Sequence, residues 1–332
     1  MARHVAFGVG HDFRNLDPSR WSWPEMYRQT IDRVVQAEEL GFDYFFVGEH
    51  HFTPDGHAPA LFPILGAVAQ ATERIRLNTY VYLLPLHHPL EVAEAVTAID
   101  LLSDGRMELG VGQGYRREEF AAFGVDRSKR GELMDEACEI LLRAWSGEPF
   151  SFEGKHFSIP EITVTPRPAQ MPHPKLWISA RSERAARRAA RFRCPLMIAP
   201  APYVDDPAIV YRAYAAELEA AGEDPADYEV MGSFTVRVVD AGQQLDMASA
   251  VARDDAYADW YTEDGDLPTD AERMANPSEE LLRLAGVTGE PATCIAAIEA
   301  LLERVPFTTL MVGGVSRNQM ERFAREVRPA FV

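Results

Sequence analysis

The chain alternates short apolar runs with longer amphipathic stretches along most of its length, and this alternation is the strongest constraint on its fold. Short apolar runs are typical of strands buried on both faces of a parallel sheet, and such strands need helical crossovers. The runs that we predict as strands are 5–8, 44–48, 76–84, 106–111, 176–179, 196–198, 230–239 and 308–312. The stretches that we predict as helices are 26–40, 61–71, 89–102, 130–145, 183–192, 206–221, 245–261, 293–304 and 318–327. Eight strand–helix steps in 332 residues predict one α/β domain over 1–332, a single (β/α)8 TIM barrel, rather than two doubly wound domains.

Two stretches break the alternation and predict insertions in the barrel. After the fourth strand, residues 150–174 are rich in proline with short apolar segments between, which predicts a hairpin and loop. After the seventh strand, residues 262–290 are acidic and contain Gly265, Pro268 and Pro277, and they are longer than a compact connection needs. Long loops of this kind often act as lids, and we expect 262–283 to order over a bound ligand.

The charge balance excludes several classes of partner. Asp and Glu number 51 against 33 Lys and Arg, so the formal net charge is −18. Nucleic acid and anionic membrane surfaces attract clustered positive charge, so we expect neither as a partner. The three cysteines, Cys138, Cys194 and Cys294, are far apart, which predicts neither a zinc site nor a disulfide framework. We find no apolar run of the ~18 residues that a membrane span needs and no secretory signal, and we expect a soluble, cytoplasmic protein.

The strand ends of such a barrel carry its functional loops, and two of the predicted loops contain paired histidines. Glu49, His50 and His51 follow the second strand, and His87 and His88 follow the third. A metal site is one interpretation of paired histidines, but adjacent residues on an extended segment point in opposite directions and cannot easily share an ion. Metal-dependent barrel hydrolases also have His-x-His after the first strand, where residues 8–14 offer a single histidine. We therefore predict no metal, with a metal hydrolase as an alternative.

Two further loops could hold an anionic ligand. Gly110, Gly112 and Gly114 follow the fourth strand, but a dinucleotide fingerprint would need glycine where Tyr115 stands, so we reject that interpretation. Small residues at a strand end would still let backbone N–H groups approach a ligand, or they could form only a tight turn. The segment 179–182 precedes a predicted helix, where its N–H groups could bind phosphate, or Ser182 could act only as a helix cap.

Taken in order, these motifs resemble those of the bacterial luciferase-like flavin monooxygenases. The segments that carry the resemblance are 46–53, 84–89, 100–106, 110–120, 123–124, 174–198, 291–301 and 328–329. The resemblance implies a TIM barrel that binds reduced FMN, supplied by a separate NAD(P)H:flavin reductase, and reacts it with O2. The resulting C4a-hydroperoxyflavin would oxygenate a small apolar organic substrate such as an aldehyde, ketone or terpenoid. It also implies a homodimer.

The resemblance assigns roles to particular residues. His50 matches the catalytic histidine, which would act as a general acid–base near the reactive edge of the flavin, and Glu49 and His51 would hold its loop. Tyr80 and Val81 match a cis peptide bond that supports the flavin ring. The remaining residues that match the flavin and phosphate segments are Gly112, Gln113, Gly114, Tyr115, Ser179, Ala180, Arg181 and Ser182.

The chain departs from luciferase at two positions. Luciferase has a phosphate-binding arginine at the position of Gln113 and a reactive cysteine at that of Gly112, and we expect Arg181 to supply the missing charge. These changes weaken the case for light emission. Two alternatives within the family are an oxidoreductase that uses F420 to transfer hydride without O2, and a non-catalytic flavin-binding subunit similar to the luciferase β chain. Retention of His50 argues against the second.

Aromatic residues near the predicted strand ends indicate an apolar substrate pocket, which would exclude water from the reaction. These residues are Phe7, Phe13, Trp21, Trp23, Phe52, Phe62, Tyr80, Tyr82, Tyr115 and Trp260, of which we assign Phe7 to the core.

Overall fold

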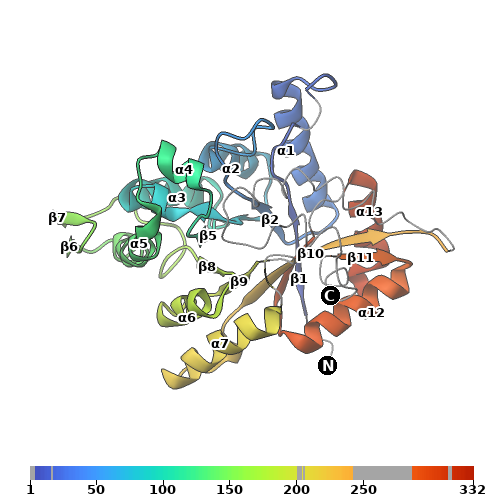
Figure 1. The fold of residues 1–332 in the computed structure, drawn as a ribbon. Helices are drawn as coiled ribbons and strands as arrows, with labels where there is room; N and C mark the ends of the chain where they lie inside the picture. Colours follow the sequence, from blue (N-terminus) through green and yellow to red (C-terminus); the bar gives the residue numbers. More distant parts are fainter. Residues whose placement is uncertain (1–3, 16–17, 200–203, 205, 242–285, 313–315) are drawn as a thin grey trace.

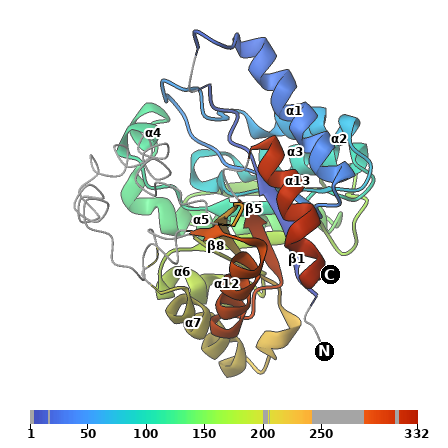
Figure 2. The same ribbon diagram turned by 90° about the vertical axis from the view of Figure 1, so that its right-hand side faces the viewer.

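The computed structural model describes residues 4–15, 18–199, 204, 206–241, 286–312 and 316–332. Figures 1 and 2 show the strands at the centre of the molecule, with helices packed around them. The backbone N–H of Val5 donates to the carbonyl of Phe331 at 3.2 Å, so the two ends of the chain lie side by side. The predicted helix 245–261 and the predicted lid 262–283 lie outside the described residues.

Parallel strands form a nearly closed barrel. The sheet runs in the order β3-β2-β1-β12-β10-β9-β8-β5-β4. β1 lies parallel to both of its neighbours, β2 and β12. The strands on this path are β1 (Ala6–Gly10), β2 (Tyr44–Val47), β3 (Arg76–Thr79), β4 (Tyr82–Leu83), β5 (Leu109–Gly112), β8 (Leu176–Ala180), β9 (Leu196–Ile198), β10 (Val230–Val238) and β12 (Thr309–Val312). A further parallel strand, β11 (Gly286–Gly289), pairs with β10. The barrel predicted from the sequence is confirmed.

One predicted strand is divided in two. The sequence predicts a single strand over 76–84, whereas the structure has β3 and β4 separated by a cis peptide bond between Tyr80 and Val81, the bond that the resemblance implies. β4 pairs with β5, and a parallel bridge between Leu77 and Met107 joins β3 to the residues before β5. The two edges of the sheet therefore meet. β3 and β4 share one position in the barrel, so the nine strands of the path occupy eight positions.

Most helices agree with the periodicity of the sequence. Three have the predicted bounds, namely α2 (Leu61–Ala71), α3 (Pro89–Leu102) and α5 (Arg130–Trp145). Five begin or end within about three residues of the prediction: α1 (Trp23–Glu39), α6 (Glu183–Arg191), α7 (Pro207–Ala220), α12 (Pro291–Arg304) and α13 (Arg317–Glu326). The insertion at 150–174 contains the expected antiparallel hairpin, β6 (Phe150–Glu153) with β7 (Ser158–Ile162). Helix α4 (Arg117–Ala122) was missed because six residues are too few for a periodic pattern.

Large side chains fill the interior of the barrel. Tyr44, Phe46, Trp177, Met197 and Met231 form one buried cluster, each at most 5% exposed. A larger apolar layer lies between the strands and the surrounding helices. A barrel packed in this way has no central channel, so a ligand must bind at one end.

A buried carboxylate occupies the end of the barrel where the strands begin. Glu108 directly precedes β5 and is fully buried. It accepts hydrogen bonds from Nε of Arg76 at 2.5 Å and from Nε1 of Trp177 at 2.6 Å, and Nζ of Lys175 lies 3.4 Å away. These partners compensate the charge that burial would otherwise penalise. They also fill this end, which leaves the opposite end for ligands.

Arg106 fastens the turn before β5 to the end of α2. Its guanidinium group donates to the carbonyls of Ala69, Thr72 and Ile75 at 2.8–2.9 Å and to Oγ1 of Thr72 at 2.9 Å. The last carbonyls of a helix have no partner within that helix, so Arg106 satisfies groups that would otherwise be orphaned.

We expect Arg106→Met to lower the free energy of unfolding by about 2–4 kcal/mol, because it leaves several buried carbonyls without donors. Urea denaturation followed by circular dichroism measures this change. The exposed Arg184 on α6 provides a matched control, and Arg184→Met should change stability by less than about 0.5 kcal/mol. Equal losses in both variants would contradict this role.

Candidate active site

His50 lies at the open end of the barrel, in the loop that follows β2, and is held from both sides of its ring. Its Nδ1 lies 2.9 Å from Oε1 of Glu119, and its Nε2 lies 3.3 Å from the hydroxyl of Tyr115. The ring also packs edge-on against His57, with centroids 4.8 Å apart. His50 is 8% exposed and Glu119 is fully buried. A carboxylate on one ring nitrogen fixes the orientation of the imidazole and directs its other nitrogen toward Tyr115.

Glu119 connects the histidine loop to the segment after β5. Its Oε1 also accepts the backbone N–H of His51 at 2.9 Å. Arg116 reinforces this contact, since its Nη1 donates to the carbonyl of His51 at 2.9 Å and lies 3.5 Å from Glu119. Oε2 of Glu119 is buried and has no hydrogen-bond partner within the described part of the chain. One oxygen of Glu119 therefore holds both the His50 ring and the backbone of His51.

Glu49 forms a second network that holds His51. Its Oε1 lies 2.7 Å from Nε2 of His51 and 2.6 Å from Nε2 of His87, and its Oε2 accepts the backbone N–H of Leu83 at 2.6 Å. Burial alone would raise the pKa of Glu49, but these hydrogen bonds outweigh burial and keep the pKa below its ordinary value. Glu49 is therefore ionised near neutral pH and fastens the loops after β2 and β4 to each other.

Glu49, His51 and His87 are also the kind of group that could hold a metal ion, with ligand atoms within 4.8 Å of one another. Ligand atoms bound 2.0–2.1 Å from a tetrahedral ion lie about 3.3 Å apart. The separations of 2.6 and 2.7 Å in this network are shorter and suit hydrogen bonds. His50 contacts Glu119 instead, so the two adjacent histidines do point to different partners. The absence of a metal stays a prediction.

The cis peptide bond between Tyr80 and Val81 lies between two glycines. A Cβ on Gly48 would come within 2.7 Å of the carbonyl oxygen of Tyr80, and one on Gly112 within 2.5 Å of the Val81 side chain. The next glycine, Gly114, has a φ of +70°, which side chains other than glycine rarely adopt. Close packing against β3 and β4 therefore explains these glycines without a ligand.

The segment after β8 reaches the same end of the barrel. Oγ of Ser182 accepts the backbone N–H of Ala185 at 3.4 Å, so Ser182 is the N-cap of α6, as one of the two interpretations predicts. The guanidinium group of Arg181 lies over the ring of Tyr115 at 5.7 Å. Arg181, Tyr115 and His50 thus form a continuous row across the mouth.

The other predicted cofactor residues surround this row at different depths. Ala180 is buried as the last residue of β8, Ser179 and Gln113 are half-buried, and Ser182 is exposed. A role for any of them toward a cofactor stays a prediction.

A family model described as luciferase-like monooxygenase matches residues 6–309, from the first residue of β1 to the first residue of β12. The chain belongs to the luciferase-like monooxygenase family. A solved monooxygenase of this kind, RslO1 from Streptomyces bottropensis, matches with a TM-score of 0.83 and 25% identity over 99% of this chain and 100% of that one.

Curated relatives of this luciferase-like chain use two kinds of cofactor. An F420-dependent hydroxymycolic acid dehydrogenase of Mycobacterium tuberculosis is 33% identical over 293 residues, 83% of this chain and 78% of that protein. The oxygenase component of a flavin-dependent trigonelline monooxygenase of Acinetobacter baylyi is 26% identical over 178 residues, 53% of this chain and 49% of that protein. Protein y4wF of Sinorhizobium fredii is 40% identical over 189 residues, 56% of this chain and 54% of that protein. The match thus spans about half of the length of several relatives.

Among the described residues of the luciferase-like chain, no helix combines the length and the hydropathy needed to cross a bilayer. Two of the aromatic residues near its strand ends, Phe13 and Phe52, differ from the expectation of a shared apolar pocket. Phe13 is 2% exposed and belongs to the core, as does Phe7. Phe52 is 64% exposed, and Trp260 lies outside the described residues.

The sequence placed His87 in a paired-histidine loop, but it assigned no role in the site to Glu119, His57 or His87. Glu119 lies on the short helix α4, where an acidic residue in the first turn is ordinary. His57 and His87 belong to loops whose path only the fold defines. The one available signal was that these loops follow strands at the same end of the barrel.

His57 is a buried base beside this site, only 1% exposed. Burial, with His50 and Arg14 close by, lowers its pKa well below the ordinary 6.5, although Asp55 opposes this shift. The folded protein therefore keeps His57 neutral at a pH where the unfolded chain would protonate it.

We expect the free energy of unfolding to fall as the pH decreases below about 6.5, because the unfolded state then binds a proton that folded His57 does not. His57→Asn should flatten this dependence between pH 7 and 5.5 in urea denaturation. Replacement of the exposed His4 by Asn is the control and should leave the slope unchanged. An unchanged slope in His57→Asn would assign the dependence to other groups, such as His11, whose pKa burial lowers to about 4.

Proposed function

We propose that this protein is the oxygenase component of a two-component flavin monooxygenase. It would take reduced FMN from a separate NAD(P)H:flavin reductase and use O2 to oxygenate a small organic substrate. One oxygen atom would enter the substrate and the other would leave as water. The observation that carries the proposal is the buried pair of Glu119 and His50, whose second ring nitrogen faces the mouth beside Tyr115. Similarity to RslO1 and to a flavin-dependent oxygenase component supports it.

The residues at the mouth fit such a cofactor. The N-terminus of α6 with Ser182, and the guanidinium group of Arg181, offer donors for a phosphate on one side. Oε2 of Glu119 is buried without a partner within the described ranges, so it can bind a water or a ligand donor. Tyr80 and Val81, joined by a cis peptide bond, lie between β3 and β4. Bound reduced flavin would supply the two electrons that O2 activation requires.

The chain's own residues would take up and release the proton of the reaction. Glu119 accepts from Nδ1 of His50 and stabilises the positive charge that the ring acquires when Nε2 takes up a proton. Nε2 can then return that proton to an oxygen held near the hydroxyl of Tyr115. Glu49 and His51 do not reach this position, because they are bonded to each other, and their role is to hold the loop. Packing at the rim would keep bulk water out.

An F420-dependent hydride transfer is the second candidate, and identity of 33% to an F420-dependent dehydrogenase over most of both chains favours it. In that case the same imidazole would exchange a proton with a substrate hydroxyl or carbonyl while the cofactor exchanged hydride. We expect a homodimer for either candidate.

The cofactor distinguishes the two functions. We expect the purified protein to bind reduced FMN at least tenfold more tightly than reduced F420, and to consume O2 with FMN when a flavin reductase and NADH are present. Anaerobic fluorescence titrations and an oxygen electrode measure both quantities. Preferential binding of F420, with no O2 consumption, would replace the proposed function by the second.

Two substitutions test the proton path. His50→Ala should slow turnover by ~10²–10⁴-fold with little effect on cofactor affinity, because it removes the general acid–base group. Glu119→Gln keeps the shape but removes the carboxylate that stabilises the charged ring during proton transfer, so turnover should also fall, by less than in His50→Ala. Glu94→Gln, at an exposed position of α3, is the control. Unchanged turnover in Glu119→Gln would remove that residue from the proton path.

A further inference from the structure

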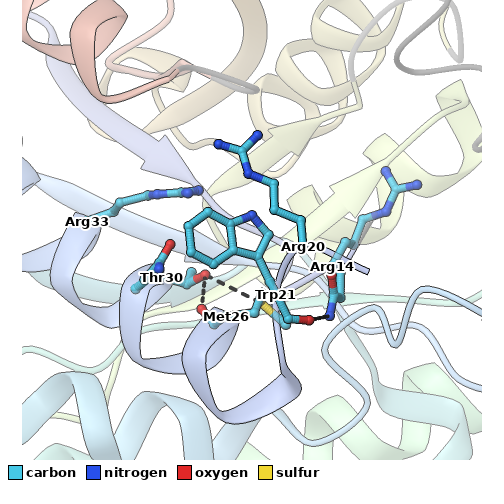
Figure 3. A pocket seen from close by; sticks show the side chains of 8 residues that line it. Arg14, Arg20, Trp21, Met26, Thr30 and Arg33 are labelled. Carbon is cyan, nitrogen blue, oxygen red and sulfur yellow. Dashed lines mark hydrogen bonds between the residues drawn. The ribbon is translucent and has the colours of Figure 1, made fainter. Parts of the chain in front are cut away.

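A cavity lined by arginines lies beside the loop that follows β1. Figure 3 shows it from close by, with the side chains of Arg20 and Arg33 reaching toward the same side of the Trp21 indole. Its volume is about 190 Å³. The residues that line it are Arg14, Asn15, Arg20, Trp21, Met26, Gln29, Thr30 and Arg33.

The charge of this cavity is unusual for the chain. The protein carries a net charge of −18, yet the described residues that line the cavity include three arginines and no carboxylate. Asp55 pairs with Arg14, and Arg20 packs its guanidinium group over Trp21 at 5.2 Å. Neither Arg20 nor Arg33 forms an ion pair with a described residue. Guanidinium groups next to amide and hydroxyl side chains and one flat aromatic ring suit an organic anion.

A series of contacts that begins at Arg14 connects the cavity to the proposed active site. Arg14 lines it and also binds Asp55, which lies close to the buried His57 that packs on His50. Burial, and next the charge of Arg33, lower the pKa of His11 to about 4, although Asp12 opposes this shift. His11 directly follows β1, so Arg33 reaches the end of that strand. His11 is therefore uncharged near neutral pH, and the positive charge in and beside the cavity comes from the arginines.

The barrel places this cavity opposite the predicted phosphate position. Along the closed sheet, β1 is followed by β2, the β3 and β4 position, β5 and β8, and in the other direction by β12, β10, β9 and β8. β8 is thus four positions from β1 either way. A cofactor whose phosphate lies at Ser182 would extend toward His50 and leave the side of β1 for a second molecule.

We propose that this cavity binds the carboxylate of an organic acid substrate, with Arg20 and Arg33 as its partners and Trp21 as an apolar wall. The inference rests on the proposed function, because it places the rest of that substrate at His50. A volume of about 190 Å³ admits one end of a small molecule rather than a whole cofactor. The substrate is then an amphipathic acid whose apolar part enters the mouth.

Binding of benzoate, a carboxylate on a flat ring, tests the cavity without any turnover. Isothermal titration calorimetry should give a benzoate affinity at least about tenfold above that of neutral benzamide, decreasing with added NaCl. Arg33→Gln should remove most of this preference. Arg28→Gln removes the same charge from an exposed position of the same helix and should preserve the preference. Equal binding of the two probes, or equal losses in both variants, would overturn the proposal.

The phosphate of the cofactor is the competing anion, and a second titration separates it. We expect Arg33→Gln to leave the affinities for FMN and riboflavin unchanged. If the variant instead binds FMN no better than riboflavin, the cavity belongs to the cofactor and the substrate proposal is wrong. Because the benzoate measurement needs neither flavin nor O2, failure of the monooxygenase assay leaves its result intact.

Discussion

Two buried carboxylates determine how the mouth of this barrel is built. A strand end sends adjacent side chains in opposite directions, so His50 and His51 need separate partners. Glu119 forms a hydrogen bond with His50 at 2.9 Å, and Glu49 forms one with His51 at 2.7 Å. A buried carboxylate is costly without donors, and each one gathers them from two different loops. The same pairing that compensates the acids therefore fixes both histidines and connects the loops.

The two ends of the barrel use buried charge differently. At the closed end, Glu108 bonds only to fixed neighbours such as Arg76 and Trp177, which fill the space around it. At the mouth, Glu119 keeps one buried oxygen without a partner among the described residues, and the ring that it holds faces another loop. A buried carboxylate whose two oxygens both accept hydrogen bonds stabilises the fold. One with an unpaired oxygen can still accept a hydrogen bond from a ligand. This contrast supports the proposal that a ligand binds at the mouth and not at the closed end.

Much of the fold could be predicted because its signals are local. Periodicity gave α2, α3 and α5 their bounds, since each has an apolar face long enough to repeat. The division of the third strand needed the resemblance, because a cis bond leaves no periodic trace. Glu119 could not be found from sequence, since its partner is 69 positions away and only the closure of the barrel joins them. The local hydrophobic pattern thus determines the helices and strands, whereas contacts between distant residues determine the site.

The sequence also predicted an apolar pocket, because aromatic residues cluster near strand ends. The number of aromatic residues near strand ends does not show which of their side chains line the same cavity. Phe13 is in the core, while Trp21 lies beside Arg20 and Arg33, which come from a loop and from one face of α1. The side chain of an arginine packs well against an indole, so one side of the cavity can be both aromatic and positively charged. A substrate that matches it must offer both a flat apolar surface and an anionic end.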